Sequence, residues 1–172
     1  IDLEKLFKEN DIRYSFLKGN FIKDAYPHRF YRWMTDIDIL IDPAKRELVH
    51  ELFTQQDFTA KTYKIDNHDI YFNSLKLVVE IHLYLFDDHF AALRKAFTPI
   101  EAEMLQQENN VLNQYLFFIA HHIKHSISSG MGIRNILDFY LVSRAYSDQL
   151  DMKQVDTAIE DWGYLEEYHR LV

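Results

Sequence analysis

Hydrophobic and polar positions alternate with two different periods along the chain, and each period predicts a different kind of element. In residues 35–41 and 75–84 apolar side chains recur at every second position, which predicts strands. In residues 46–56 apolar positions are three or four apart, which predicts a helix that starts at the capping pair Asp42-Pro43. Residues 58–85 therefore read as strands joined by turns near 67–68 and 73–74.

The pattern changes after residue 86, where no further strand is predicted. The dipeptide Thr98-Pro99 predicts a break in the chain, because proline disfavours the helical conformation of the residue before it. We therefore expect an α/β domain in residues 1–98 and a helical domain in residues 99–172. The expected fold class is α+β, with a small mixed sheet and flanking helices followed by a helical bundle. Helical spacing after residue 86 predicts helices near 88–97, 100–107, 110–128, 133–147, 151–161 and 164–171.

Acidic residues interrupt two of the predicted strands. Asp36 and Asp38 share one strand face because side chains alternate with a period of two, and strands disfavour Asp. Glu80 lies between apolar residues, where an unpaired carboxylate is costly to bury. If the strands are neighbours, the three carboxylates converge as in two-metal sites for phosphoryl chemistry. The alternative is that they face water or pair with Arg29, Arg32 or Lys76, and the spacing alone leaves both readings open.

The segment Leu17-Lys18-Gly19-Asn20 is a second candidate for chemistry. A strand that ends in glycine and opens a helix directs backbone N–H groups at one point, which suits a phosphate. Gly19 would allow close approach of an anion, and Lys18 would add a positive charge. The alternative is an ordinary tight turn capped by Asn20.

Composition narrows the possible partners. A formal charge of −8 argues against a long nucleic acid, although a nucleotide can bind through a few local cations and a metal. No run of 18 apolar residues occurs, so we expect no membrane span. The lack of cysteine excludes disulfides and thiolate metal sites and is consistent with a cytoplasmic protein. Because the chain opens with Ile1 and not Met, we expect it to be a fragment of a longer product.

The order of these segments resembles the nucleotidyltransferase superfamily that includes DNA polymerase beta. More narrowly, it is similar to the "uncharacterised nucleotidyltransferase" family, with its Leu-Lys-Gly turn, an Arg before Asp-x-Asp and a later Val-Glu-x-His strand. Here these motifs are residues 17–19, Arg32, residues 36–38 and residues 79–82, and the likeness covers about residues 13–85.

The resemblance implies a function and an assignment of residues. Asp36 and Asp38 would bind Mg²⁺ ions that also hold the triphosphate of a nucleotide, and Glu80 would be the third ligand and help to deprotonate the acceptor. Gly19 would lie beneath the phosphates. The chain departs from the superfamily in two places, since Asn20 stands where serine is usual and Glu80 where aspartate is common.

The predicted helix at 110–128 and the segment before the first acid add further candidates. Lys124, together with His121 or His125 on the same helix face, is expected to meet phosphate or acceptor. Arg32 would either reach a phosphate or neutralise Asp36. The spacing of Arg134 and Asp138 predicts an ion pair within one helix, and the aromatic segment 30–33 predicts core packing or, alternatively, a stack on a base.

These observations lead to a leading hypothesis and an alternative. The leading hypothesis is a Mg²⁺-dependent nucleotidyltransferase that acts on a nucleoside triphosphate and a small-molecule or protein acceptor. The alternative is a nucleotidyltransferase-fold module without turnover that binds a nucleotide or a protein. The predicted catalytic and metal-binding residues are Asp36, Asp38 and Glu80, and the predicted nucleotide-binding residues are Lys18, Gly19, Asn20, Arg32 and Lys124.

Overall fold

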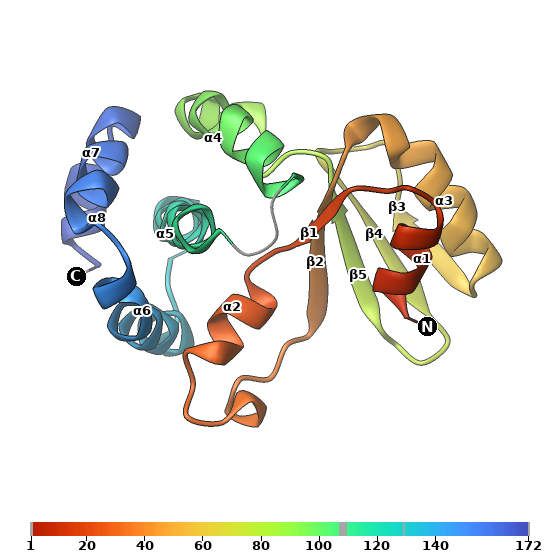
Figure 1. Cartoon of the computed structure of the whole chain (residues 1–172), viewed down its shortest axis with the longest axis horizontal. Helices are drawn as coiled ribbons and strands as arrows, with labels where there is room; N and C mark the ends of the chain where they lie inside the picture. Colours follow the sequence, from red (N-terminus) through yellow and green to blue (C-terminus); the bar gives the residue numbers. More distant parts are fainter. Residues whose placement is uncertain (1, 107–109, 129, 172) are drawn as a thin grey trace.

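A computed structural model describes residues 2–106, 110–128 and 130–171 of the chain. Five strands form one mixed sheet in the order β1-β2-β5-β4-β3, in which β2 and β5 are parallel and the other neighbours are antiparallel (Figure 1). The strands are β1 (Tyr14–Phe16), β2 (Asp36–Ile41), β3 (Phe58–Thr62), β4 (His68–Asn73) and β5 (Val78–His82).

The helices divide between the two faces of the sheet. α1 and α3 cover one face, and the helices from α4 onward lie on the other side (Figure 1). The α-helices are α1 (Leu3–Glu9), α2 (Gly19–Asp24), α3 (Arg46–Gln55), α4 (Ala91–Met104), α5 (Val111–Ser128), α6 (Ile133–Tyr146), α7 (Met152–Trp162) and α8 (Leu165–His169). Short 3₁₀ turns are η1 (Arg29–Tyr31), η2 (Pro43–Lys45), η3 (Asp88–Phe90) and η4 (Ser147–Gln149).

The period of two in β2 assigns its side chains to two different cores. Ile39 and Ile41 pack with Phe7 and Phe53 in the core beneath α1 and α3. Leu40 points the other way and belongs to the core of the helical half. Asp36 and Asp38 share the face of Leu40, so the sheet presents its acids toward the helices.

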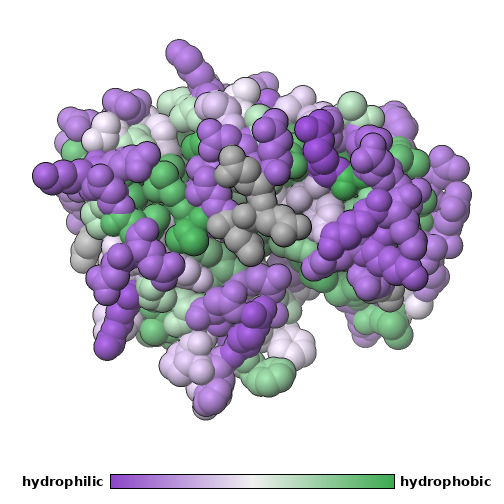
Figure 2. Space-filling model, viewed as in Figure 1, coloured by the Kyte–Doolittle hydropathy of each residue, from purple (hydrophilic) through white to green (hydrophobic). Residues whose placement is uncertain are grey.

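The long helix α5 organises the helical half. It contacts α4, α6, α7 and α8, and its residues 115–120 are buried (Figure 1). The same core extends to Leu17 and Ile22 of the α/β half. In the matching space-filling view, polar side chains cover most of the visible face, with smaller apolar areas between them (Figure 2). No helix among the described residues is long and apolar enough to cross a membrane.

The predicted α+β fold class is confirmed, but the break predicted at Thr98-Pro99 is wrong. α4 runs through Pro99, so the two helices expected at 88–97 and 100–107 are one. Proline removes one backbone donor and crowds the preceding turn, but it does not have to end a helix that packs against a core. Leu93, Phe97 and Met104 are buried on one side of α4 and hold both of its segments to the same core. The division into domains 1–98 and 99–172 stays a prediction.

The aromatic segment before β2 does not pack in the core as expected. Phe30 is 95% exposed and Trp33 is 76% exposed. The segment begins in the 3₁₀ turn η1 and continues in irregular backbone, where the Arg32 side chain donates to Asp138 and to the backbone carbonyl of Trp33. Aromatic character before a strand therefore did not predict burial here.

Candidate functional site

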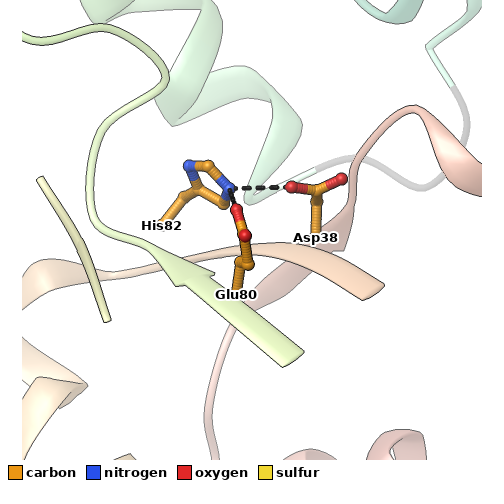
Figure 3. Close-up of side chains that lie close together, drawn as sticks. All are labelled: Asp38, Glu80 and His82. Atoms are coloured by element: carbon orange, nitrogen blue, oxygen red, sulfur yellow. Dashed lines mark hydrogen bonds and ion pairs between the residues drawn. The ribbon is translucent and has the colours of Figure 1, made fainter. Parts of the chain in front are cut away.

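Two parallel strands bring acidic and imidazole side chains together on the sheet face that looks toward the helices. The register pairs Asp38 of β2 with Glu80 of β5, and His82 follows Glu80 on the same face. His82 Nε2 lies 3.0 Å from Asp38 Oδ1 and 3.7 Å from Glu80 Oε2 (Figure 3). One potential ligand atom from each of the three residues lies within 4.8 Å of the other two. We call these three residues the acid cluster.

Lys18 closes the acid cluster from the turn that follows β1. Its Nζ lies 3.2 Å from Asp38 Oδ2, and the side chain is only 14% exposed. The backbone of Lys18 has φ 46° and ψ −55°, close to the γ-turn geometry that is rare for a residue with a side chain. Surrounding contacts must hold such a conformation, and at Lys18 they include the ion pair with Asp38.

The surroundings of the cluster shift the pKa values of its two carboxyl groups in opposite directions. Burial alone would raise the pKa of Asp38, but the hydrogen bond with His82 and the charge of Lys18 hold that pKa at about 2. Burial raises the pKa of Glu80, and the negative charge of Asp38 raises it further. Burial also lowers the pKa of His82, which outweighs the opposite effect of Asp38. At neutral pH Asp38 is therefore ionised and His82 is neutral.

These side chains fit a divalent cation. Two carboxylates on one face repel each other. After burial, the charge of Asp38 is the next largest effect that raises the pKa of Glu80, and a cation between the two groups would remove that repulsion. Carboxylate oxygens suit Mg²⁺, and a neutral imidazole extends the choice to Mn²⁺. The Nδ1 atom of His82 is buried and has no hydrogen-bond partner among the described residues.

Asp36, the first acid of the predicted set, lies outside the acid cluster. It shares the sheet face of Asp38 and is half-buried, but it is not within 4.8 Å of the three clustered groups together. Its charge still raises the pKa of Glu80, so it lies near enough to act on the cluster. The structure thus brings Asp38 and Glu80 together, with Asp36 beside them.

Gly19 and Asn20, predicted to bind a nucleotide, follow Lys18 at the start of α2. A side-chain methyl at Gly19 would meet Met34 Cε at 3.6 Å, which is ordinary contact, so space alone does not require glycine there. The Asn20 side-chain oxygen accepts a hydrogen bond from Arg29 at 2.9 Å. Both residues follow Lys18 directly in the sequence, and Lys18 is the residue of this turn that contacts the acid cluster.

The two more distant cations predicted for the nucleotide contact other carboxylates. Arg32 does not neutralise Asp36; its Nε and Nη2 donate to Asp138 of α6, with Nη2 at 2.7 Å from Oδ2. Lys124 Nζ lies 3.3 Å from Asp87 Oδ2, at the end of the segment after β5. Within the described part of the chain, neither cation forms a hydrogen bond or ion pair with Asp38 or Glu80.

The predicted ion pair between Arg134 and Asp138 within one helix does not form, so this prediction is wrong. Asp138 is 1% exposed and accepts from Arg32 and from the Tyr26 hydroxyl, which lies 2.6 Å away. Arg134 instead donates to the backbone carbonyl of Trp33. Both bonds tie the segment before β2 to α6, which sequence spacing within α6 could not reveal.

His121, which the sequence placed on the same helix face as Lys124, reaches the cluster through Lys18. Its Nε2 lies 3.4 Å from Lys18 Nζ and 2.9 Å from His125 Nε2. His121 stands one helical turn after Phe117, whose ring lies 6.0 Å from Lys18 Nζ. The face shared with His125 was visible in the sequence, but Lys124 had been expected to make the contact.

His122, the neighbour on the buried side of α5, makes stability depend on pH. Burial lowers its pKa from 6.5 to about 4, so folding favours the neutral ring. The unfolded chain takes up a proton below pH 6.5 while the folded chain does not, so stability falls as pH drops from 6.5 toward 4. For this residue we expect a loss of about 3 kcal/mol over that window.

Urea unfolding of the wild type and of His122→Gln at pH 7 and pH 4.5 measures this contribution. The variant should lose less stability on acidification than the wild type, because its side chain does not titrate. His89→Gln is the matched control, since that side chain is 94% exposed. An equal acid loss in the wild type and in His122→Gln would contradict the prediction.

Comparison with known proteins adds two findings and one negative result. A family model described as "uncharacterised nucleotidyltransferase" matches residues 1–172. Among solved structures, the chain is similar to the antibiotic-resistance factor ANT(2'')-Ia in solution, a protein with substrate-regulated conformation dynamics. The match has 11% identity and a TM-score of 0.60 and covers 95% of this chain and 91% of that one, so it shows a shared fold. No curated protein matches the sequence.

Proposed function

The chain belongs to the uncharacterised nucleotidyltransferase family, and we propose that it transfers a nucleoside monophosphate from a nucleoside triphosphate to an acceptor. The observation that carries this proposal is the acid cluster, in which Asp38 and Glu80 from two parallel strands face the helical half. The acceptor is proposed to be a small molecule or a protein side chain, because the charge of −8 disfavours a long nucleic acid.

The reaction is a substitution at the α-phosphorus. An acceptor hydroxyl oxygen forms the new bond to the α-phosphorus. The bond between the α-phosphorus and the oxygen that bridges it to the β-phosphorus breaks, and pyrophosphate leaves. Mg²⁺ held by Asp38 and Glu80, with Asp36 beside them, would supply positive charge to the phosphate oxygens. In this proposal Glu80 also helps to take up the hydroxyl proton, since its carboxylate lies in the same cluster as Asp38.

The cations around the site divide into two groups in this proposal. Lys18, which already contacts Asp38, would meet the phosphates, with Gly19 and Asn20 beside it. We propose that Arg32 and Lys124 support the site without contacting the phosphates, because Arg32 is already paired with Asp138 and Lys124 with Asp87.

A nucleotide screen by thermal denaturation tests the proposal. ATP, GTP, CTP and UTP are each added with MgCl₂, MnCl₂ or EDTA. At least one nucleotide should raise the melting temperature with a metal but not with EDTA, since a ligand at 100 times its Kd stabilises by about 2.7 kcal/mol. Pyrophosphate release is then followed with mixtures of acceptors. No stabilisation by any nucleotide with either metal would contradict the proposal.

The alternative, a module that binds a nucleotide without turnover, rests on Asn20. A serine hydroxyl at this position would be free to contact phosphate, whereas Asn20 gives its oxygen to Arg29. This module would bind a nucleotide with metal in calorimetry and release no pyrophosphate with any acceptor. Pyrophosphate release above the rate of an Asp38→Asn variant would exclude it.

A further inference from the structure

We propose that Lys18 is an internal counter-ion of the acid cluster that makes the binding of metal depend on the binding of triphosphate. The inference rests on the proposed function and deepens it, because it assigns a regulatory role within the same site. Free metal would have to compete with the Lys18 ammonium at Asp38. A metal–triphosphate complex would also supply phosphate oxygens, to which the Lys18 ammonium could bind in place of Asp38.

The geometry places Lys18 at the carboxylate that a metal would need. Lys18 Nζ is 3.2 Å from Asp38 Oδ2, and the other oxygen of Asp38 is held by His82. Asp38 is 5% exposed, so neither contact is an incidental surface pair. Both oxygens of the more buried acid of the cluster are thus engaged within the protein itself.

The charges decide which ligand can enter. Asp38 and Glu80 supply the negative charges of the cluster, and Lys18 already offsets one of them. A dication that arrives alone meets a like charge at the same carboxylate, and in a half-buried site this repulsion weakens binding strongly. A triphosphate reverses the sign of that effect, because its oxygens accept hydrogen bonds from the released ammonium.

The helix α5 offers Lys18 a second contact that survives such a release. His121 Nε2 lies 3.4 Å from Lys18 Nζ, and His121 is neutral because burial and the nearby cations lower its pKa. A neutral imidazole can accept a hydrogen bond from the ammonium without adding charge. The γ-turn at Lys18 fixes the start of the side chain between β2 and α5, so only its end has to move.

Calorimetric titrations with MnCl₂ alone and with Mn²⁺–tripolyphosphate test the proposal, because tripolyphosphate carries the anion without a base. In Lys18→Met, Mn²⁺ alone should bind about tenfold more tightly than in the wild type, because the competing charge is gone. Mn²⁺–tripolyphosphate should bind about tenfold more weakly, because its oxygens lose a charged donor. A purely structural role of Lys18 would weaken both titrations.

Lys18→Gln repeats the loss of charge with a polar side chain, in case the methionine variant does not fold. Lys18→Arg keeps the charge and should retain the preference of the wild type for the complex over free metal. Lys61→Met on the exposed edge of β3 is the matched control for charge loss and should change neither titration.

Two results would overturn the inference, and they differ in what else they affect. If the wild type binds Mn²⁺–tripolyphosphate but Lys18→Met and Lys18→Gln shift both titrations in one direction or neither, Lys18 does not couple the two ligands. The proposed function would stand in that case. If the wild type binds neither Mn²⁺ nor its complex, the proposed function fails together with the inference.

Discussion

Asp38→Asn is expected to reduce nucleotidyl transfer by about a thousandfold or more, with a similar loss of metal-dependent nucleotide binding. Asp38 is the only acid in the described part of the chain that contacts both Lys18 and His82. Its pKa of about 2 keeps it ionised under all working conditions. Asparagine keeps the shape of the side chain but removes the charge that a cation needs, so the fold should persist while chemistry is lost.

The rate is measured as pyrophosphate release with the nucleotide and acceptor found in the screen, and the melting temperature is measured alongside. Asp156→Asn on the exposed side of α7 is the matched control and should retain the wild-type rate. Glu80→Gln should also lose activity, and Asp36→Asn tests whether an acid outside the cluster contributes. A folded Asp38→Asn protein with the wild-type rate would remove the enzymatic hypothesis.

Arg32→Met is expected to destabilise the fold by about 3–5 kcal/mol, which lowers the melting temperature by on the order of 10 °C. Asp138 is 1% exposed and receives two donors from Arg32, so methionine would leave a buried carboxylate whose remaining partner among the described residues is Tyr26. Burial and the hydrogen bond with Asp138 raise the pKa of Tyr26 to about 12, so this hydroxyl keeps its proton but brings no positive charge.

Urea and thermal unfolding measure the loss, and two further variants identify its cause. Arg144→Met lies on the exposed side of the same helix as Asp138 and should change stability by less than about 0.5 kcal/mol. The double variant Arg32→Met/Asp138→Leu should recover part of the loss, because no charge is then buried alone. A melting temperature of Arg32→Met equal to that of the wild type would show that the pair contributes little.

The sequence predicted the sheet and the helices well because their signals are local. The alternation in residues 35–41 places Asp36 and Asp38 on one face without any knowledge of the neighbouring strand. The break predicted at Pro99 failed for a physical reason, because core contacts on both sides of the proline outweigh the missing hydrogen bond. The exposed ring of Phe30 shows the same limit, since hydrophobicity does not say which side of the protein a turn occupies.

The site was predictable only where it follows from one strand or one turn. The pairing of Asp38 with Glu80 was a hypothesis until the parallel register placed the two strands side by side. Spacing predicted that Arg134 would meet Asp138, because residues four apart on a helix are neighbours. Arg32, more than a hundred residues away along the chain, takes that position instead.

Local spacing in the sequence thus determined which side chains share a face: the acids of β2, the acid and imidazole of β5, and the histidines of α5. Only the tertiary structure decided which of these faces meet, and it placed Lys18 between Asp38 and His121. The reason is that the period of a strand or helix fixes the direction of a side chain, whereas its partner depends on packing between distant segments. An ammonium, a carboxylate and an imidazole can each form hydrogen bonds with many different groups. The core that packs β2 against α5 determines which of these groups lie within reach.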